Sequence, residues 1–157
     1  VSIGAHLDSW DVGTGALDDG MGVAMMLASA HHIAQLPERP KRTIRVILFA
    51  AEEVGLLGAK EYMEIHKDNM ANHIIGAEWD FGVGKIYKMT SGVGKKSLGA
   101  ISDLAKHLAS LGVELSSDNN AKAQSDMSVM SAAGMPSMNF APDGSKYFDY
   151  HHTENNT

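Results

Sequence analysis

A nine-residue run from Thr43 to Ala51 (TIRVILFAA) constrains the fold more than any other segment. It is rich in β-branched residues and almost continuously apolar, which is typical of a central strand covered on both faces of a parallel sheet. Two adjacent acids, Glu52 and Glu53, follow it directly. The run therefore predicts a buried sheet whose strand ends carry charged side chains.

The rest of the chain alternates between strand-like and helix-like segments. Apolar residues at helical spacing, such as Val23, Met26 and Ile33, predict a helix over 21–36 that Pro37 and Pro40 terminate. Further helices are expected over 56–70 and 95–111, and further strands over 1–7, 74–81, 85–89 and 136–140. This order predicts an α/β three-layer sandwich with a mixed, mostly parallel central sheet flanked by helices.

Length and composition exclude several classes of protein. The 157 residues are expected to form one domain, 1–157, and the chain begins inside an apolar stretch, so we take it as part of a larger catalytic unit. A net charge of −6 without a basic cluster argues against nucleic-acid and membrane partners. The absence of cysteine excludes disulfides and thiolate metal ligands.

Metal-binding side chains follow three of the expected strands. His6 and Asp8 end the first, Glu52 and Glu53 follow the second, and Asp80 follows the third. Ligands of such sheets collect outside the carboxyl ends of the strands. Each motif alone has a structural alternative, because acids also favour helix N-termini and turns. Together they fit a hydrolytic site for two divalent ions, with the candidates His6, Asp8, Asp18, Asp19, Glu52, Glu53, Asp80 and His152.

The motifs also resemble a known family in their order. HLDS, GALDDGMG, FAAEEVGLLGAK, EWDFG and HHTENNT resemble the zinc exopeptidases of the bacterial leucyl aminopeptidase type, and more closely their glutamate carboxypeptidase-like (carboxypeptidase Q) relatives. The resemblance implies the zinc exopeptidase (phosphorylase/hydrolase-like) fold and hydrolysis of a peptide or dipeptide. Members are commonly exported, which suggests a secreted or periplasmic protein. Homo-oligomer formation stays open.

The resemblance assigns a role to each matching position. It implies two Zn²⁺ ions bridged by Asp18, with a peptide bond after this residue that is often cis. Glu52 falls on the general base that takes a proton from the attacking water, and Asp8 on the carboxylate that orients the first histidine. His152 falls on the last ligand, whereas His151 does not. The implied metal ligands are His6, Asp18, Glu53, Asp80 and His152.

Two departures from the family pattern affect residues near the site. Asn156 stands where the family has Asp, which affects support for His152, and Met127 replaces the histidine of an SDH segment that begins with Ser125 and Asp126. Tyr147 and Tyr150, close to His152, are candidate donors to an oxyanion.

Two other functions remain open from the sequence. One is a single-zinc enzyme of the glutaminyl cyclase kind. The other is a catalytically silent binding domain, like the protease-like domain of the transferrin receptor.

Overall fold

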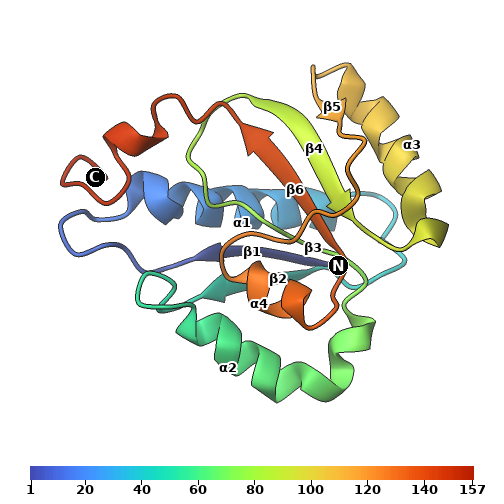
Figure 1. Cartoon of the computed structure of the whole chain (residues 1–157), viewed down its shortest axis with the longest axis horizontal. Helices are drawn as coiled ribbons and strands as arrows, with labels where there is room; N and C mark the ends of the chain where they lie inside the picture. The colour runs from blue at the N-terminus through green and yellow to red at the C-terminus, as the bar shows by residue number, and fades with distance from the viewer.

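A six-stranded mixed sheet forms the centre of the computed structural model, which describes all 157 residues (Figure 1). The strand order is β2-β1-β3-β6-β4-β5. All neighbours are parallel except β4 and β6, which pair antiparallel. The strands are β1 (Ser2–His6), β2 (Arg45–Phe49), β3 (Gly76–Glu78), β4 (Ile86–Gly92), β5 (Glu114–Leu115) and β6 (Ser137–Pro142).

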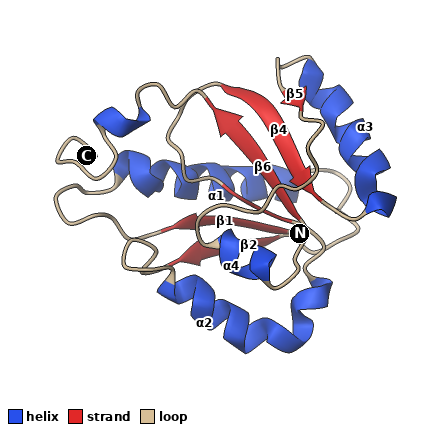
Figure 2. Cartoon of the chain, viewed as in Figure 1, coloured by secondary structure: helices blue, strands red, loops and turns tan.

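Helices cover the sheet, as Figure 2 shows, and confirm the predicted three-layer α/β sandwich. The longer helix α1 packs on β1 and β2, whereas α4 packs on β3 and α2. Short helical turns η1 (Ala16–Gly20), η2 (Lys67–Asn72), η3 (Lys95–Ser97) and η4 (Tyr147–Asp149) join the elements. The α-helices are α1 (Met21–Ala34), α2 (Leu57–His66), α3 (Leu98–Ala109) and α4 (Met127–Ala132). None of these helices has the length and apolar character needed to cross a membrane.

The expectation of a central strand over 43–51 is wrong for this chain. Strand β2 lies at one edge of the sheet, and only Phe49 among its five residues is fully buried. An apolar run reports that a strand is covered but does not report which strands pair with it, and here β1 takes the position between β2 and β3. The short elements β5 and α4 were not predicted, because two to six residues are too few to show a period.

Methionine side chains fill much of the core. Met127 and Met130 of α4 are completely buried and pack with Phe49 of β2 and Ala59 of α2. A second cluster, built on Met89, Ile101 and Val113, joins α3 to β4 and β5. Met127, the residue that replaces the family's histidine, is therefore part of the core. The first cluster fixes α4, and with it the turn at Ser125, against the β1–β3 half of the sheet.

Gly22, in the first turn of α1, provides a test of how closely this helix packs against Asp19 and Trp79. A Cβ atom at Gly22 would lie 2.2 Å from an Asp19 carboxylate oxygen and 2.3 Å from the Trp79 carbonyl oxygen. We expect Gly22→Ala to lower the free energy of unfolding by about 1–3 kcal/mol, the usual effect of overpacking. Urea denaturation measures this change.

Gly99 is the matched control, since it occupies the same position in α3 and has open space around it. Gly99→Ala should leave stability unchanged or raise it by up to about 1 kcal/mol, because alanine favours a helix. Equal effects of the two substitutions would contradict the close packing at Gly22.

Candidate metal centre

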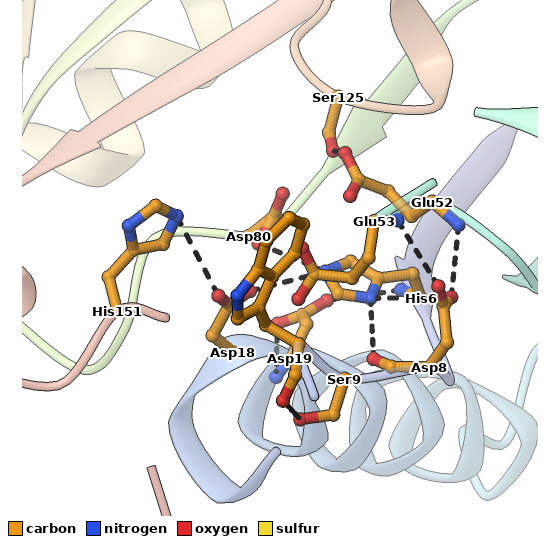
Figure 3. Close-up of polar contacts among 12 residues, drawn as sticks. His6, Asp8, Ser9, Asp18, Asp19, Glu52, Glu53, Asp80, Ser125 and His151 are labelled. Atoms are coloured by element: carbon orange, nitrogen blue, oxygen red, sulfur yellow. Dashed lines mark hydrogen bonds and ion pairs between the residues drawn. The ribbon is translucent and has the colours of Figure 1, made fainter. Parts of the chain in front are cut away.

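The predicted ligands converge at the carboxyl edge of β2, β1 and β3, which are neighbours in the sheet. His6 is the last residue of β1, Glu52 and Glu53 lie in the turn after β2, and Asp80 follows β3. Asp18 reaches the same place from the loop between β1 and α1. Figure 3 shows these side chains gathered around the His6 imidazole.

His6, Asp18 and Asp80 form the first group. The His6 Nε2 atom lies 3.3 Å from Asp18 Oδ1 and 3.4 Å from Asp80 Oδ1. The other ring nitrogen, Nδ1, lies 2.9 Å from the Asp8 carbonyl oxygen. Because only an Nδ1–H can donate to this carbonyl, loss of a proton from the ring leaves the lone pair on Nε2, which faces the two carboxylates. This is the tautomer that a metal ligand needs.

The second group lies on the other side of Asp18. Its second oxygen, Oδ2, is 3.7 Å from His151 Nε2 and 3.8 Å from His152 Nε2. His152 Nε2 is also 2.8 Å from Glu53 Oε2. The two sets in which ligand atoms lie within 4.8 Å of one another are His6–Asp18–Asp80 and Asp18–His151–His152. Asp18 is the member that they share.

Several of these atoms are buried without a hydrogen-bond partner. They are His6 Nε2, Asp18 Oδ2, Glu53 Oε1 and Asp80 Oδ1. An unpaired buried polar atom destabilises a fold by about 1–3 kcal/mol, so such atoms are normally paired. Four in one place, on imidazole and carboxylate groups aimed at a common centre, fit the donor set of a divalent cation.

The charges of the buried groups are strongly perturbed. Burial opposes a charge on His6, but the neighbouring carboxylates of Asp18 and Asp80 outweigh this effect and raise the His6 pKa to about 12. Burial and the charge of Asp80 raise the pKa of Asp19 to about 8. Burial likewise raises the pKa of Glu53. These raised pKa values indicate an excess of negative charge in the cluster, which a bound cation would neutralise.

Glu52 has a different environment from Glu53. Both glutamates line a cavity of about 450 Å³ with Asp18, Asp80 and Ser125, but only Glu53 forms an ion pair with His152. The Ser125 hydroxyl donates a hydrogen bond of 2.6 Å to Glu52 Oε1, at a residue whose φ is +46°. Glu52 therefore faces the open space beside the ligand atoms, with one carboxylate oxygen held.

The chain matches known proteins over its whole length. The profile of Peptidase family M28 matches residues 1–157. The chain belongs to this family. Carboxypeptidase Q of Xenopus laevis is 36% identical over 157 residues, which are 100% of this chain and 33% of that protein. The chain thus spans about a third of the length of this relative.

Two solved M28-like structures share the fold. The crystal structure of a peptidase M28 precursor from Shewanella amazonensis has a TM-score of 0.94 and 50% identity, covering 100% of this chain and 35% of that one. BSAP, a zinc aminopeptidase from Bacillus subtilis, has a TM-score of 0.74 and 26% identity, covering 99% of this chain and 40% of that one. The predicted family and fold are confirmed.

Within this M28 site, Asp8 supports more than His6. Its carboxylate was expected to orient His6, but the shorter contact to the imidazole comes from the Asp8 carbonyl, and the carboxylate is 3.7 Å from Nδ1. The two carboxylate oxygens instead accept hydrogen bonds from the backbone N–H groups of Glu52 (3.0 Å) and Glu53 (3.1 Å). Two donors on one turn attract a carboxylate more strongly than one ring nitrogen does. Asp8 therefore anchors the Glu52–Glu53 turn.

Asn156 contacts the Asp18 segment and makes no side-chain hydrogen bond to His152, the residue it was expected to support. Its Oδ1 accepts the N–H groups of Leu17 (2.8 Å) and Asp18 (3.2 Å), and its Nδ2 donates to the Asp18 carbonyl (3.0 Å). An amide can accept and donate at once, as this site requires. The peptide bond that follows Asp18 is cis, as the family resemblance implies.

The other predicted residues lie at different depths. Asp126 is completely buried and does not line the site cavity. Tyr147 is buried between Phe81 (4.4 Å between ring centroids) and His151 (5.0 Å). Tyr150 is 38% exposed, and both tyrosines line a neighbouring cavity instead.

Sequence reasoning missed the part played by three residues. Asp19 accepts the His6 N–H (3.1 Å) and the Gly22 N–H (3.0 Å), and so joins β1 to α1. Glu78 accepts the Met127 N–H at 2.7 Å. His151 faces Asp18 beside His152. Repetition in the chain, Asp18-Asp19 and His151-His152, was the available signal for two of them.

Asn156 provides a test of how Asp18 is held. Asn156→Ala should lower the free energy of unfolding by about 2–4 kcal/mol, because it removes three hydrogen bonds in a buried place. Thermal and urea unfolding measure the loss. Asn155→Ala is the matched control, since Asn155 is exposed and its side chain makes no hydrogen bond; a similar loss there would contradict the assignment.

The metal-free protein should become less stable as the pH rises. Burial raises the pKa of Glu78 to about 9 and that of Asp126 to about 7. In the unfolded chain the pKa of a side-chain carboxyl is about 4. Between these values only the folded state keeps the protons, so the free energy of unfolding falls with increasing pH. Urea unfolding with a chelator at several pH values between about 5.5 and 8.5 measures this slope.

Asp126→Asn should flatten the same slope, since it removes one of the buried acids without changing its shape. A stability that rises with pH in the parent protein would show that these carboxyls are ionised at neutral pH in the folded state.

Proposed function

We propose that this protein is a zinc-dependent exopeptidase with a two-ion site. The observation that carries the proposal is the position of Asp18, whose two carboxylate oxygens face two separate groups of ligand atoms. Asp18 is almost completely buried, and its Oδ2 has no hydrogen-bond partner. A carboxylate between two cations is the arrangement that satisfies both oxygens.

The donor set suits zinc. His6, Asp18 and Asp80 would hold one ion, and Asp18, Glu53 and His152 the other. Imidazole nitrogen and carboxylate oxygen are ordinary zinc ligands, and three protein ligands per ion leave positions for water or substrate. When bound, zinc lowers the pKa of water toward neutrality and polarises a carbonyl oxygen.

Glu52 is proposed as the general base. It lines the cavity, forms no ion pair with a histidine as Glu53 does, and has one oxygen held by the Ser125 hydroxyl. Glu52 accepts a proton as the water oxygen bonds to the carbonyl carbon. It then delivers this proton to the leaving amine as the C–N bond breaks, so that one acid serves both steps.

The substrate is proposed to be a short peptide or dipeptide. The relatives carry names of both kinds, carboxypeptidase Q and zinc aminopeptidase, so amino-terminal and carboxy-terminal cleavage both belong in the assay. A panel of aminoacyl reporters and dipeptides, with and without a chelator, separates the two. Loss of turnover with the chelator and recovery with zinc support the proposal.

Zinc content separates the alternatives left open by the sequence. Two ions per chain support the two-ion peptidase, one supports an enzyme of the glutaminyl cyclase kind, and none supports a silent binding domain. Retention of every ligand and of Glu52 favours the first, since a silent domain has no need of them.

Adjacent acids offer a matched pair of variants. Glu52→Gln should keep the parent's zinc content and lower kcat by about 10²–10⁴-fold, because it removes only the proton acceptor. Glu53→Gln should lower zinc content, because an amide is a weaker ligand than a carboxylate. Metal analysis and turnover of the same preparations measure both.

The assignment of roles would be wrong if Glu52→Gln retained full activity, or if it lost zinc as Glu53→Gln does. A zinc-loaded parent that hydrolysed no peptide of the panel would contradict the proposed function itself.

A further inference from the structure

We propose that His151 is a further catalytic residue, which donates a hydrogen bond from Nε2 to the oxyanion formed on the scissile carbonyl. The inference rests on the proposed peptidase function. It goes beyond the resemblance to known exopeptidases, which assigns no role to this position.

The first support is the place of His151 in the site. It lines the same cavity as Glu52 and Ser125, and its Nε2 is 3.7 Å from Asp18 Oδ2. Its side chain is 31% exposed, so it is accessible from the cavity. Figure 3 shows His151 and Glu52 on opposite sides of Asp18. A carbonyl lying between them would meet the proton acceptor on one side and a donor on the other.

The second support is geometric and concerns why His151 is not simply another metal ligand. The rings of His151 and His152 are stacked, with centroids 3.7 Å apart and planes 20° from parallel. A metal ion lies in the plane of the imidazole that binds it, about 2.0–2.1 Å from the nitrogen. An ion in the plane of one ring therefore lies well outside the plane of the other, and the two rings cannot both bind it well.

The ring that contacts the other ligands is His152. Its Nε2 is 2.8 Å from Glu53 Oε2, and the indole of Trp10 stacks on it with centroids 4.5 Å apart and planes 14° from parallel. Trp10 and His151 thus hold His152 between them. His151 keeps its Nε2 free of any hydrogen bond or second carboxylate contact, and this nitrogen is available to a substrate.

The third support is the way His151 is held. Its backbone N–H donates to the Tyr147 carbonyl at 3.0 Å, and the rings of Tyr147 (5.0 Å) and Phe148 (5.7 Å) pack around its imidazole. The imidazole is therefore backed by aromatic rings on one side and open to the cavity on the other. A fixed donor in such a place stabilises a developing negative charge without having to reorganise.

The step balances without any further reactant. The water oxygen bonds to the carbonyl carbon, the C=O π electrons move to the oxygen, and Glu52 holds the proton lost by the water. His151 donates its N–H to this oxyanion and keeps the proton throughout. When the C=O bond re-forms, the C–N bond breaks and the amine leaves with the proton from Glu52.

His151→Phe tests the proposal, because phenylalanine preserves the ring stack and removes the donor. In the zinc-loaded protein we expect kcat to fall about 10²–10³-fold, as for loss of one oxyanion donor, while KM changes little. Zinc content should equal that of the parent. Affinity for a phosphinic dipeptide analogue, which mimics the tetrahedral state, should fall by the same factor as kcat/KM.

His151→Gln, which restores an N–H, should recover part of kcat and of the analogue affinity. His107→Phe, at an exposed histidine of α3, is the matched control and should change nothing. A structural role alone would not weaken the tetrahedral analogue more than the substrate.

The inference is overturned if His151→Phe keeps the parent's kcat, or if its zinc content falls in step with activity. An inactive zinc-loaded parent would overturn the proposed function and this inference with it. An active parent with an unimpaired His151→Phe variant would overturn the inference alone.

Discussion

Mutual repulsion among buried carboxylates is the constraint on which the rest of this structure depends. Asp18, Asp19 and Glu53 crowd the carboxyl edge of three parallel strands, and Asp80 joins them from the end of β3. In the absence of a cation the cluster draws protons to itself, as the raised pKa values of His6 and Asp19 record. Apolar residues would pack there at a lower cost in free energy, so the arrangement fits a site for a cation.

Adjacent identical residues divide the work of the site. In the two acidic pairs, the neighbouring side chains make different contacts. Asp18 faces both ligand groups while Asp19 holds the backbone of β1 and α1. Glu53 contacts His152, whereas Glu52 accepts a hydrogen bond from the Ser125 hydroxyl. His151 and His152 stack and present their nitrogens to the same carboxylate. Duplication in the chain thus places side chains with different partners at one site, His152 against Glu53 and His151 against Tyr147.

The convergence of the ligands could be predicted because it depends on topology. Once β1, β2 and β3 are parallel neighbours, whatever follows them meets at one edge, and His6, Glu53 and Asp80 need no further information. The partners of the supporting groups could not be predicted in this way. Asp8 holds the Glu52–Glu53 turn, and Asn156 holds the Asp18 backbone, through contacts between segments whose spacing in the chain carries no signal. The edge position of β2 could not be predicted either, because the order in which strands pair is not a property of any single strand.

The contact between Asn156 and Asp18 spans 138 positions of the chain. Nearly every other element lies between these two residues in the chain, and closure of so long a loop is slow relative to local folding. During synthesis on the ribosome the carboxylate at the centre of the cluster stays unanchored until Asn156 has emerged.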